Sequence, residues 1–175
     1  MRIFALVVLT IVLGMSPASA WEEYIYLDRG VAIQFPVRPQ MTTGMHQSIL
    51  VKGLASTIYS AQDDNVLYRL TVVDLAGHTD AANNLLNEAA YSLMREGDVL
   101  FTDFPRVYQD EKAIYGVTLV VDRTDASRAR TSLYVSKGKL YLADAIVLPA
   151  RGDKDMTTPS RFDQTIRFPP DGRFD

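Results

Sequence analysis

The chain has 175 residues, with 18 Lys and Arg against 21 Asp and Glu, and it contains no cysteine. Without cysteine the protein can form no disulfide, no thiolate nucleophile, no Cys-ligated metal site and no lipid-modified cysteine. The mildly acidic balance argues against nucleic-acid binding, which usually requires a basic surface.

The first twenty residues have the pattern of an export signal. Arg2 precedes an apolar run over residues 3–15, and the segment ends in Ala-Ser-Ala, a small-residue pattern that signal peptidase cleaves. The run is shorter than the roughly 20 residues that a membrane-spanning helix needs. We therefore expect cleavage after Ala20 and a single mature domain over residues 21–175, with no stable membrane anchor. The periplasm is the expected location, and secretion to the medium, which begins with the same kind of signal, is the alternative.

The mature chain opens with short strands separated by turns. Gly30 follows two polar residues and can adopt a positive φ, which suits a hairpin turn. Pro36 and Pro39 then interrupt strand pairing, and Gly53 lies in the turn of a second predicted pair. The expected strands of this half cover residues 24–27, 31–35, 48–52, 54–60 and 66–74.

One amphipathic helix is predicted near residues 80–96. Apolar residues recur there at spacings of three and four, as they do on the core-facing side of a helix. Thr79 or Asp80 can cap its first amides, and Gly97 suits the left-handed position after its last turn. The side chains of this helix that we expect to be buried include Leu86 and Leu93.

The second half reads as antiparallel hairpins followed by a short helix. That helix is expected over residues 158–166, because Pro159 suits a first helical position and Phe162 should face the core. The expected strands cover residues 99–104, 113–122, 128–136 and 139–148. Together the elements indicate an α+β domain, with an antiparallel sheet of about seven to nine strands covered by the long helix on one face and the short helix as a second cover.

Both ends of the mature region carry distinct motifs. Residues 28–36 read DRGVAIQFP and are followed by Pro39, whereas residues 139–142 read KLYL and residues 161–168 read RFDQTIRF. These segments resemble the opening and closing motifs of the PsbP-like domain family. The resemblance implies an α/β/α sandwich and an assembly, docking or accessory role rather than catalysis. It carries no metal ligand or partner-binding residue over to this chain.

Two sets of residues are candidates for a site. Arg128, Arg130 and Tyr134 should share one face of a strand, where two guanidiniums and a phenol could dock an acidic partner or an anionic ligand. The alternative is an edge strand whose charges discourage aggregation. The second set, at the start of the long helix, comprises Asp74, His78 and Asp80.

Imidazole and carboxylates can ligate a divalent metal, so this second set is a weak candidate metal site. The alternative is that Asp74 ends a strand, Asp80 caps the helix and His78 is solvated. A hydrolase built on His78 and Asp80 is the weakest hypothesis, because the chain lacks the G-x-S-x-G, H-E-x-x-H, P-loop and dinucleotide-binding motifs. We expect no cofactor.

Three hypotheses of function remain open. The leading one is a periplasmic, non-enzymatic accessory or protein-docking module. The second is a carrier for a small apolar or anionic ligand, suggested by the nine tyrosines and the Arg128 and Arg130 face. A tyrosine-lined pocket is one possibility for those rings, and ordinary packing in the core of the sheet is the other. The third hypothesis is the hydrolase.

Overall fold

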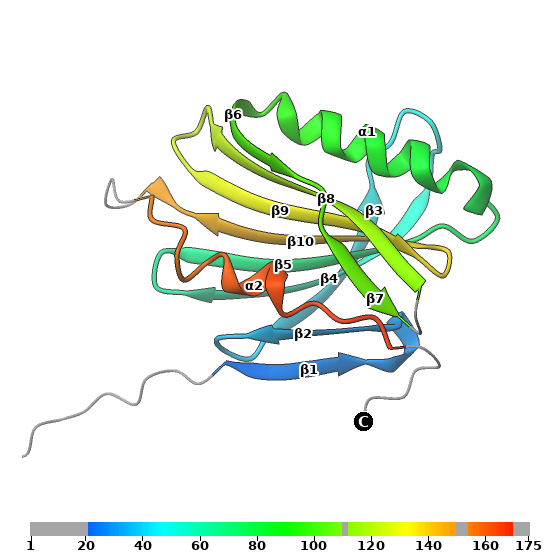
Figure 1. Cartoon of the computed structure of the whole chain (residues 1–175), viewed down its shortest axis with the longest axis horizontal. Coiled ribbons are helices and arrows are strands. Elements are labelled where there is room, and N and C mark those ends of the chain that lie inside the picture. Colours follow the sequence, from blue (N-terminus) through cyan, green and yellow to red (C-terminus); the bar gives the residue numbers. More distant parts are fainter. Residues whose placement is uncertain (1–20, 110–111, 150–153, 170–175) are drawn as a thin grey trace, which may run out of the picture.

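The computed structural model describes residues 21–109, 112–149 and 154–169, and the expected export signal over residues 1–20 lies outside them (Figure 1). A large antiparallel sheet dominates the fold. Its strands are β3 (Gln40–His46), β4 (Leu54–Asp63), β5 (Val66–Asp74), β6 (Gly97–Asp103), β7 (Arg106–Gln109), β8 (Lys112–Arg123), β9 (Arg128–Ser136) and β10 (Lys139–Val147). They follow the order β3-β4-β5-β10-β9-β8-β6, and β7 pairs with residues 112–115 of β8.

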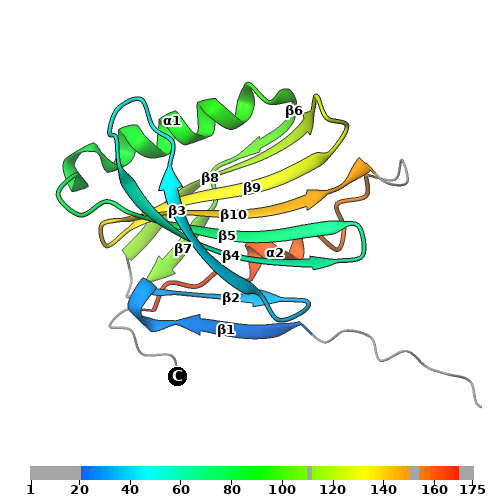
Figure 2. The same cartoon turned by 180° about the vertical axis from the view of Figure 1, so that it is seen from behind.

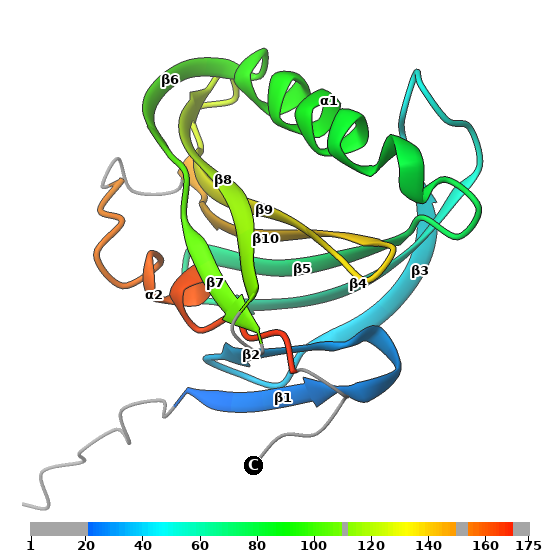
Figure 3. The same cartoon turned by 45° about the vertical axis from the view of Figure 1, so that its right-hand side comes forward.

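The long helix α1 (Ala82–Met94) crosses one face of this sheet over β8 and β9 (Figure 3). It buries Leu85 and Leu86 as expected, whereas Leu93 is only half-buried. The expected side-chain cap is wrong, because residues Thr79–Ala81 form the 3-10 turn η2 and lead into α1 without a capping side-chain bond. Gly97 does not end the helix either. It opens β6, where an added Cβ would overlap the carbonyl oxygen of Asp122.

The other face is covered mainly by a separate hairpin of two strands, β1 (Glu22–Tyr26) and β2 (Val31–Phe35). They are joined by the 3-10 turn η1 (Leu27–Arg29), after which Gly30 takes the expected positive φ of 67°. The short helix α2 (Arg161–Gln164) lies beside this hairpin. The expected second helical cover is therefore reduced to about one turn, because the hairpin occupies most of that face.

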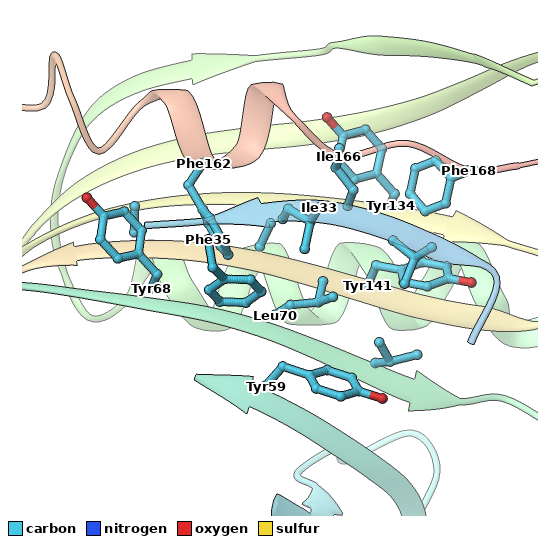
Figure 4. Close-up of a cluster of buried hydrophobic side chains, with 14 of the residues drawn as sticks. Ile33, Phe35, Tyr59, Tyr68, Leu70, Tyr134, Tyr141, Phe162, Ile166 and Phe168 are labelled. Atoms are coloured by element: carbon cyan, nitrogen blue, oxygen red, sulfur yellow. The ribbon is translucent and has the colours of Figure 1, made fainter. Parts of the chain in front are cut away.

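The main core lies between the sheet and this second cover (Figure 4). Phe35 from β2 contacts Phe162 from α2 edge to face, with ring centroids 4.9 Å apart. Phe162 also contacts Tyr68 of β5, so three elements far apart in the sequence meet at one ring. A second cluster, between the sheet and α1, is centred on Leu85, Leu133 and Leu140.

One strand predicted from the sequence is wrong, and two observed strands were not predicted. Residues 48–52 form a bent loop, and β4 pairs instead with β3, which the sequence did not indicate. The hydroxyl of Ser48 accepts bonds from the amides of Leu50 and Val51, both at 3.1 Å, so these amides are not free for strand pairing. The short strand β7 was also missed. None of the helices in the described ranges has the length and apolar character needed to cross a membrane.

Candidate functional site

The proposed basic patch at Arg128, Arg130 and Tyr134 does not exist as an exposed surface. Arg130 donates from Nε and Nη2 to the two carboxylate oxygens of Asp163, at 2.8 and 3.0 Å. Asp163 also accepts a bond of 2.7 Å from Ser132 Oγ. Tyr134 is buried against Phe168. The expectation was wrong because β9 is a central strand and this face lies beneath α2 and the segment that follows it.

Arg128 is also paired within the fold. Its Nε and Nη2 donate to the carboxylate of Asp122 at 2.7 and 2.9 Å, and its Nη1 donates to the backbone oxygen of Lys154. The bonds from Arg128 lower the pKa of Asp122 from 3.8 to about 2, against the opposing effect of burial. Both arginines therefore attach the closing segment of the chain to the sheet, and neither is free to dock a partner.

Asp74, His78 and Asp80 are not gathered into a metal site. Asp74 accepts a bond from the amide of Ala76, and the backbone of His78 forms the turn before η2. All three residues are exposed, and no cluster of three or more potential metal ligands occurs in the part of the chain that the structure describes. No bond joins the His78 and Asp80 side chains in that part either, so the geometry gives the hydrolase hypothesis no support.

Most strand tyrosines pack in the core instead of lining a pocket. Tyr59, Tyr68, Tyr134 and Tyr141 are buried, and burial raises the pKa of Tyr68 and of Tyr134 to about 12. The hydroxyl of Tyr141 donates to the backbone oxygen of Arg29 at 2.8 Å. These rings stabilise the sheet and its second cover, so they do not form a ligand cavity.

A groove that the sequence did not reveal lies on the outer side of α1, beside the loop between β3 and β4. We call it the α1 groove. It has a volume of about 610 Å³. Its walls are Ile49 and Leu50 from the loop and Asn84, Asn87, Glu88, Tyr91, Met94 and Arg95 from α1.

Glu88 holds the loop against the helix. Its carboxylate accepts bonds of 2.6 Å from Ser48 Oγ and from the amide of Ile49. Partial burial raises the pKa of Glu88, but the bonds from Ser48 and from the loop amides outweigh this effect and lower it overall. The loop is therefore anchored at its base by an ionised carboxylate, while its apolar tip points away from the core.

Three large side chains beside this anchor are exposed. The exposed fractions are 87% for Ile49, 54% for Leu50 and 67% for Tyr91, whereas the next loop residue, Val51, packs against the second core cluster. Scattered exposed apolar residues are normal, but a group of three around a concave surface is typical of a binding site. The signal of this site in the sequence was the run Ile49-Leu50-Val51, two residues before Gly53, and this run resembles a strand.

Comparison with known proteins gives the fold alone. No family model and no curated protein matches the sequence. The solution structure of cyanobacterial PsbP (CyanoP) from Synechocystis sp. PCC 6803 is similar, with a TM-score of 0.51 and 12% sequence identity, over 89% of this chain and 95% of that chain. The expected PsbP-like fold is therefore supported at the level of architecture.

Proposed function

We propose that the protein is a periplasmic, non-enzymatic accessory module that docks an apolar segment of a protein partner in the α1 groove. The observation that carries this proposal is the exposed group of Ile49, Leu50 and Tyr91 beside a loop that Glu88 holds in place. The motifs that resemble those of PsbP-like domains imply an accessory role, and the similarity in fold to PsbP agrees with that resemblance.

The groove has the chemistry of an interface centre. Burying an exposed isoleucine or leucine side chain contributes about 1.5–3 kcal/mol, and tyrosine is enriched among the residues that dominate binding energy. The bonds from Ser48 and Ile49 to Glu88 order the loop before any partner arrives. A pre-ordered loop loses less conformational entropy on binding, so more of the burial energy contributes to affinity.

A small apolar ligand is the second candidate occupant of the same groove. Its volume of about 610 Å³ lies in the range of small-molecule pockets. Met94 and Leu50 offer apolar walls, and Arg95 offers a cation that could pair with an acidic head group. This alternative keeps the carrier hypothesis open, at a location different from the Arg128 and Arg130 face.

The experiment compares what the protein retains when it is purified from its native periplasm. The groove variant Ile49→Ser/Tyr91→Ser should lose a stoichiometric protein partner that the wild type retains. The matched control, Thr124→Ala/Lys139→Ala, changes two residues that lie outside the groove, and this variant should retain the partner. Mass spectrometry of proteins and small molecules identifies the occupant. Retention of a small molecule alone would favour the carrier, and unchanged retention by the groove variant would reject the site.

Export is the second part of the proposal. Trp21, the first residue after the expected cleavage site, packs edge to face on Tyr68 with ring centroids 5.2 Å apart, and Arg161 lies 5.1 Å from its ring. These contacts place the expected first residue of the mature chain inside the folded domain, as a chain that starts at Trp21 requires. N-terminal sequencing of the protein recovered from the periplasm should begin Trp-Glu-Glu. Recovery of the intact chain with the membranes would contradict the proposal.

A further inference from the structure

The edge strand β6 presents apolar side chains beside a backbone edge that no other described strand pairs with. β6 is the last strand in the order of the sheet and pairs with β8 on one side only (Figure 3). The exposed fractions are 42% for Val99, 52% for Leu100 and 47% for Phe101, and Phe104, which follows the strand, is 69% exposed. We call the strand and these four side chains the β6 edge.

This edge lacks two of the features that commonly prevent sheets from pairing with other chains. Such edges are protected by charged side chains, especially lysine, by proline or by a bulge. β6 contains neither lysine nor proline. It has one irregularity: Val99 pairs with Val121 and Phe101 with Val120, so Leu100 is an extra residue, and regular pairing resumes as far as Asp103. Bulges of this kind often lie next to functional sites, where they redirect side chains.

The charges on the β6 edge are acidic. Asp98 and Asp103 are exposed near its two ends, and neither takes part in the ion pairs of the described residues. One oxygen of Asp103 accepts a bond of 2.8 Å from the amide of Phe104. The nearby cations are engaged elsewhere. Arg123 pairs with Glu96 at 2.6 Å, and Arg106 lies over the ring of Tyr115 at 5.5 Å. The edge therefore combines free backbone groups, an apolar centre and two carboxylates.

We propose that the β6 edge binds an extended segment of another protein by strand addition, and that this segment carries apolar residues in its centre and Lys or Arg at its ends. Main-chain hydrogen bonds give affinity in such complexes, and side chains give specificity. Seven residues in a strand span about 23 Å, so a partner segment of similar length places a cation near each of Asp98 and Asp103.

A second copy of this chain fits the edge less well. In the fully overlapping antiparallel pairing, Gly97 of one copy faces Asp103 of the other, and four carboxylates gather along one short ribbon without a cation. A shift by one residue places Asp98 directly opposite Asp103, and like charges directly opposite are destabilising. The charge pattern therefore favours a basic partner over self-association.

The test uses two labelled peptides, Lys-Val-Thr-Val-Thr-Val-Lys and Glu-Val-Thr-Val-Thr-Val-Glu, both blocked at their ends, with binding measured by fluorescence anisotropy. The lysine peptide should bind about 3- to 30-fold more tightly than the glutamate peptide at low salt, and high salt should reduce this ratio. The variant Asp98→Lys/Asp103→Lys should reverse the preference. The matched control Gln40→Lys/Thr42→Lys places the same charges on β3, the opposite edge of the sheet (Figure 2), and should leave it unchanged.

Hydrogen exchange then locates the bound peptide. Amides of residues 97–103 should exchange more slowly in its presence, and those of β3 should not. Equal binding of both peptides, protection at β3, or dimerisation without peptide binding would each overturn the proposal. Circular dichroism confirms that each variant is folded. This test does not depend on the proposed function of the α1 groove, because the groove variant Ile49→Ser/Tyr91→Ser leaves the β6 edge intact and should bind the peptides as the wild type does.

Discussion

Replacing Asp163 with alanine should remove a large part of the stability of this domain. Asp163 is 6% exposed and accepts three bonds, two from Arg130 and one from Ser132. The substitution leaves the guanidinium of Arg130, whose side chain is 17% exposed, without its counter-charge. Breaking a buried pair from one side typically costs about 3–5 kcal/mol, which is a large fraction of the roughly 5–15 kcal/mol that stabilises a domain.

Urea denaturation followed by tryptophan fluorescence measures this loss. Trp21 is the single tryptophan, and its ring centroid lies 6.5 Å from that of Phe162, the neighbour of Asp163, so its emission reports whether α2 stays docked. The double variant Arg130→Met/Asp163→Leu should recover most of the stability, because it leaves no unpaired charge. The matched control is Glu23→Ala, which breaks an exposed pair and should cost about 1 kcal/mol or less. A loss below about 1 kcal/mol for Asp163→Ala would refute the reasoning.

Three further effects follow from particular residues. The pKa of Asp122 is about 2 instead of 3.8, so its pairing with Arg128 stabilises the fold above about pH 4, and this stabilisation is lost as the pH falls toward 2. The difference in stability between the wild type and Asp122→Asn should therefore shrink as the pH is lowered over that range. Leu86→Ala should cost about 2–5 kcal/mol in urea denaturation, and a change below about 0.5 kcal/mol would mean that the helix face is misassigned. Gly116→Ala should destabilise the fold by about 1–3 kcal/mol and so lower the thermal midpoint, because the added Cβ would overlap the Tyr134 ring. An unchanged midpoint would contradict this close contact.

Strands that are rich in β-branched and aromatic residues and are bounded by turn residues could be predicted from the sequence. β9 was located at the observed residues, Arg128–Ser136, because its β-branched and aromatic residues lie between clear turns. β3 was missed because Gln40–His46 is an exposed edge strand, and its residues show no alternation of apolar and polar side chains. The apolar run at residues 48–52 predicts a strand, whereas the Ser48 hydroxyl accepts bonds from the loop amides and folds the segment into a turn.

The candidate sites show a different limit. Alternation along β9 correctly places Arg130 and Tyr134 on one face, but it does not reveal whether that face is exposed. The answer depends on Asp163, which is 33 residues away and packs on β9 from α2. The α1 groove likewise forms between a loop and a helix, joined by the bond between Ser48 and Glu88, which are 40 residues apart. The spacing of residues within one strand or helix cannot reveal contacts between residues that are this far apart in the sequence.

The closing segment of the chain also sets the order in which the fold can be completed during synthesis. The hairpin of β1 and β2 is attached to it by two backbone bonds of 2.9 Å between Ala32 and Arg167 and by one from the amide of Gln34 to Thr165. Phe162 and Ile166 complete the core beneath the hairpin. A ribosome therefore releases the first strands long before their partners exist. The aromatic face of the sheet stays uncovered until residues 162–168 have been synthesised. During this interval the incomplete chain exposes apolar surface, to which chaperones can bind and through which the chain can aggregate.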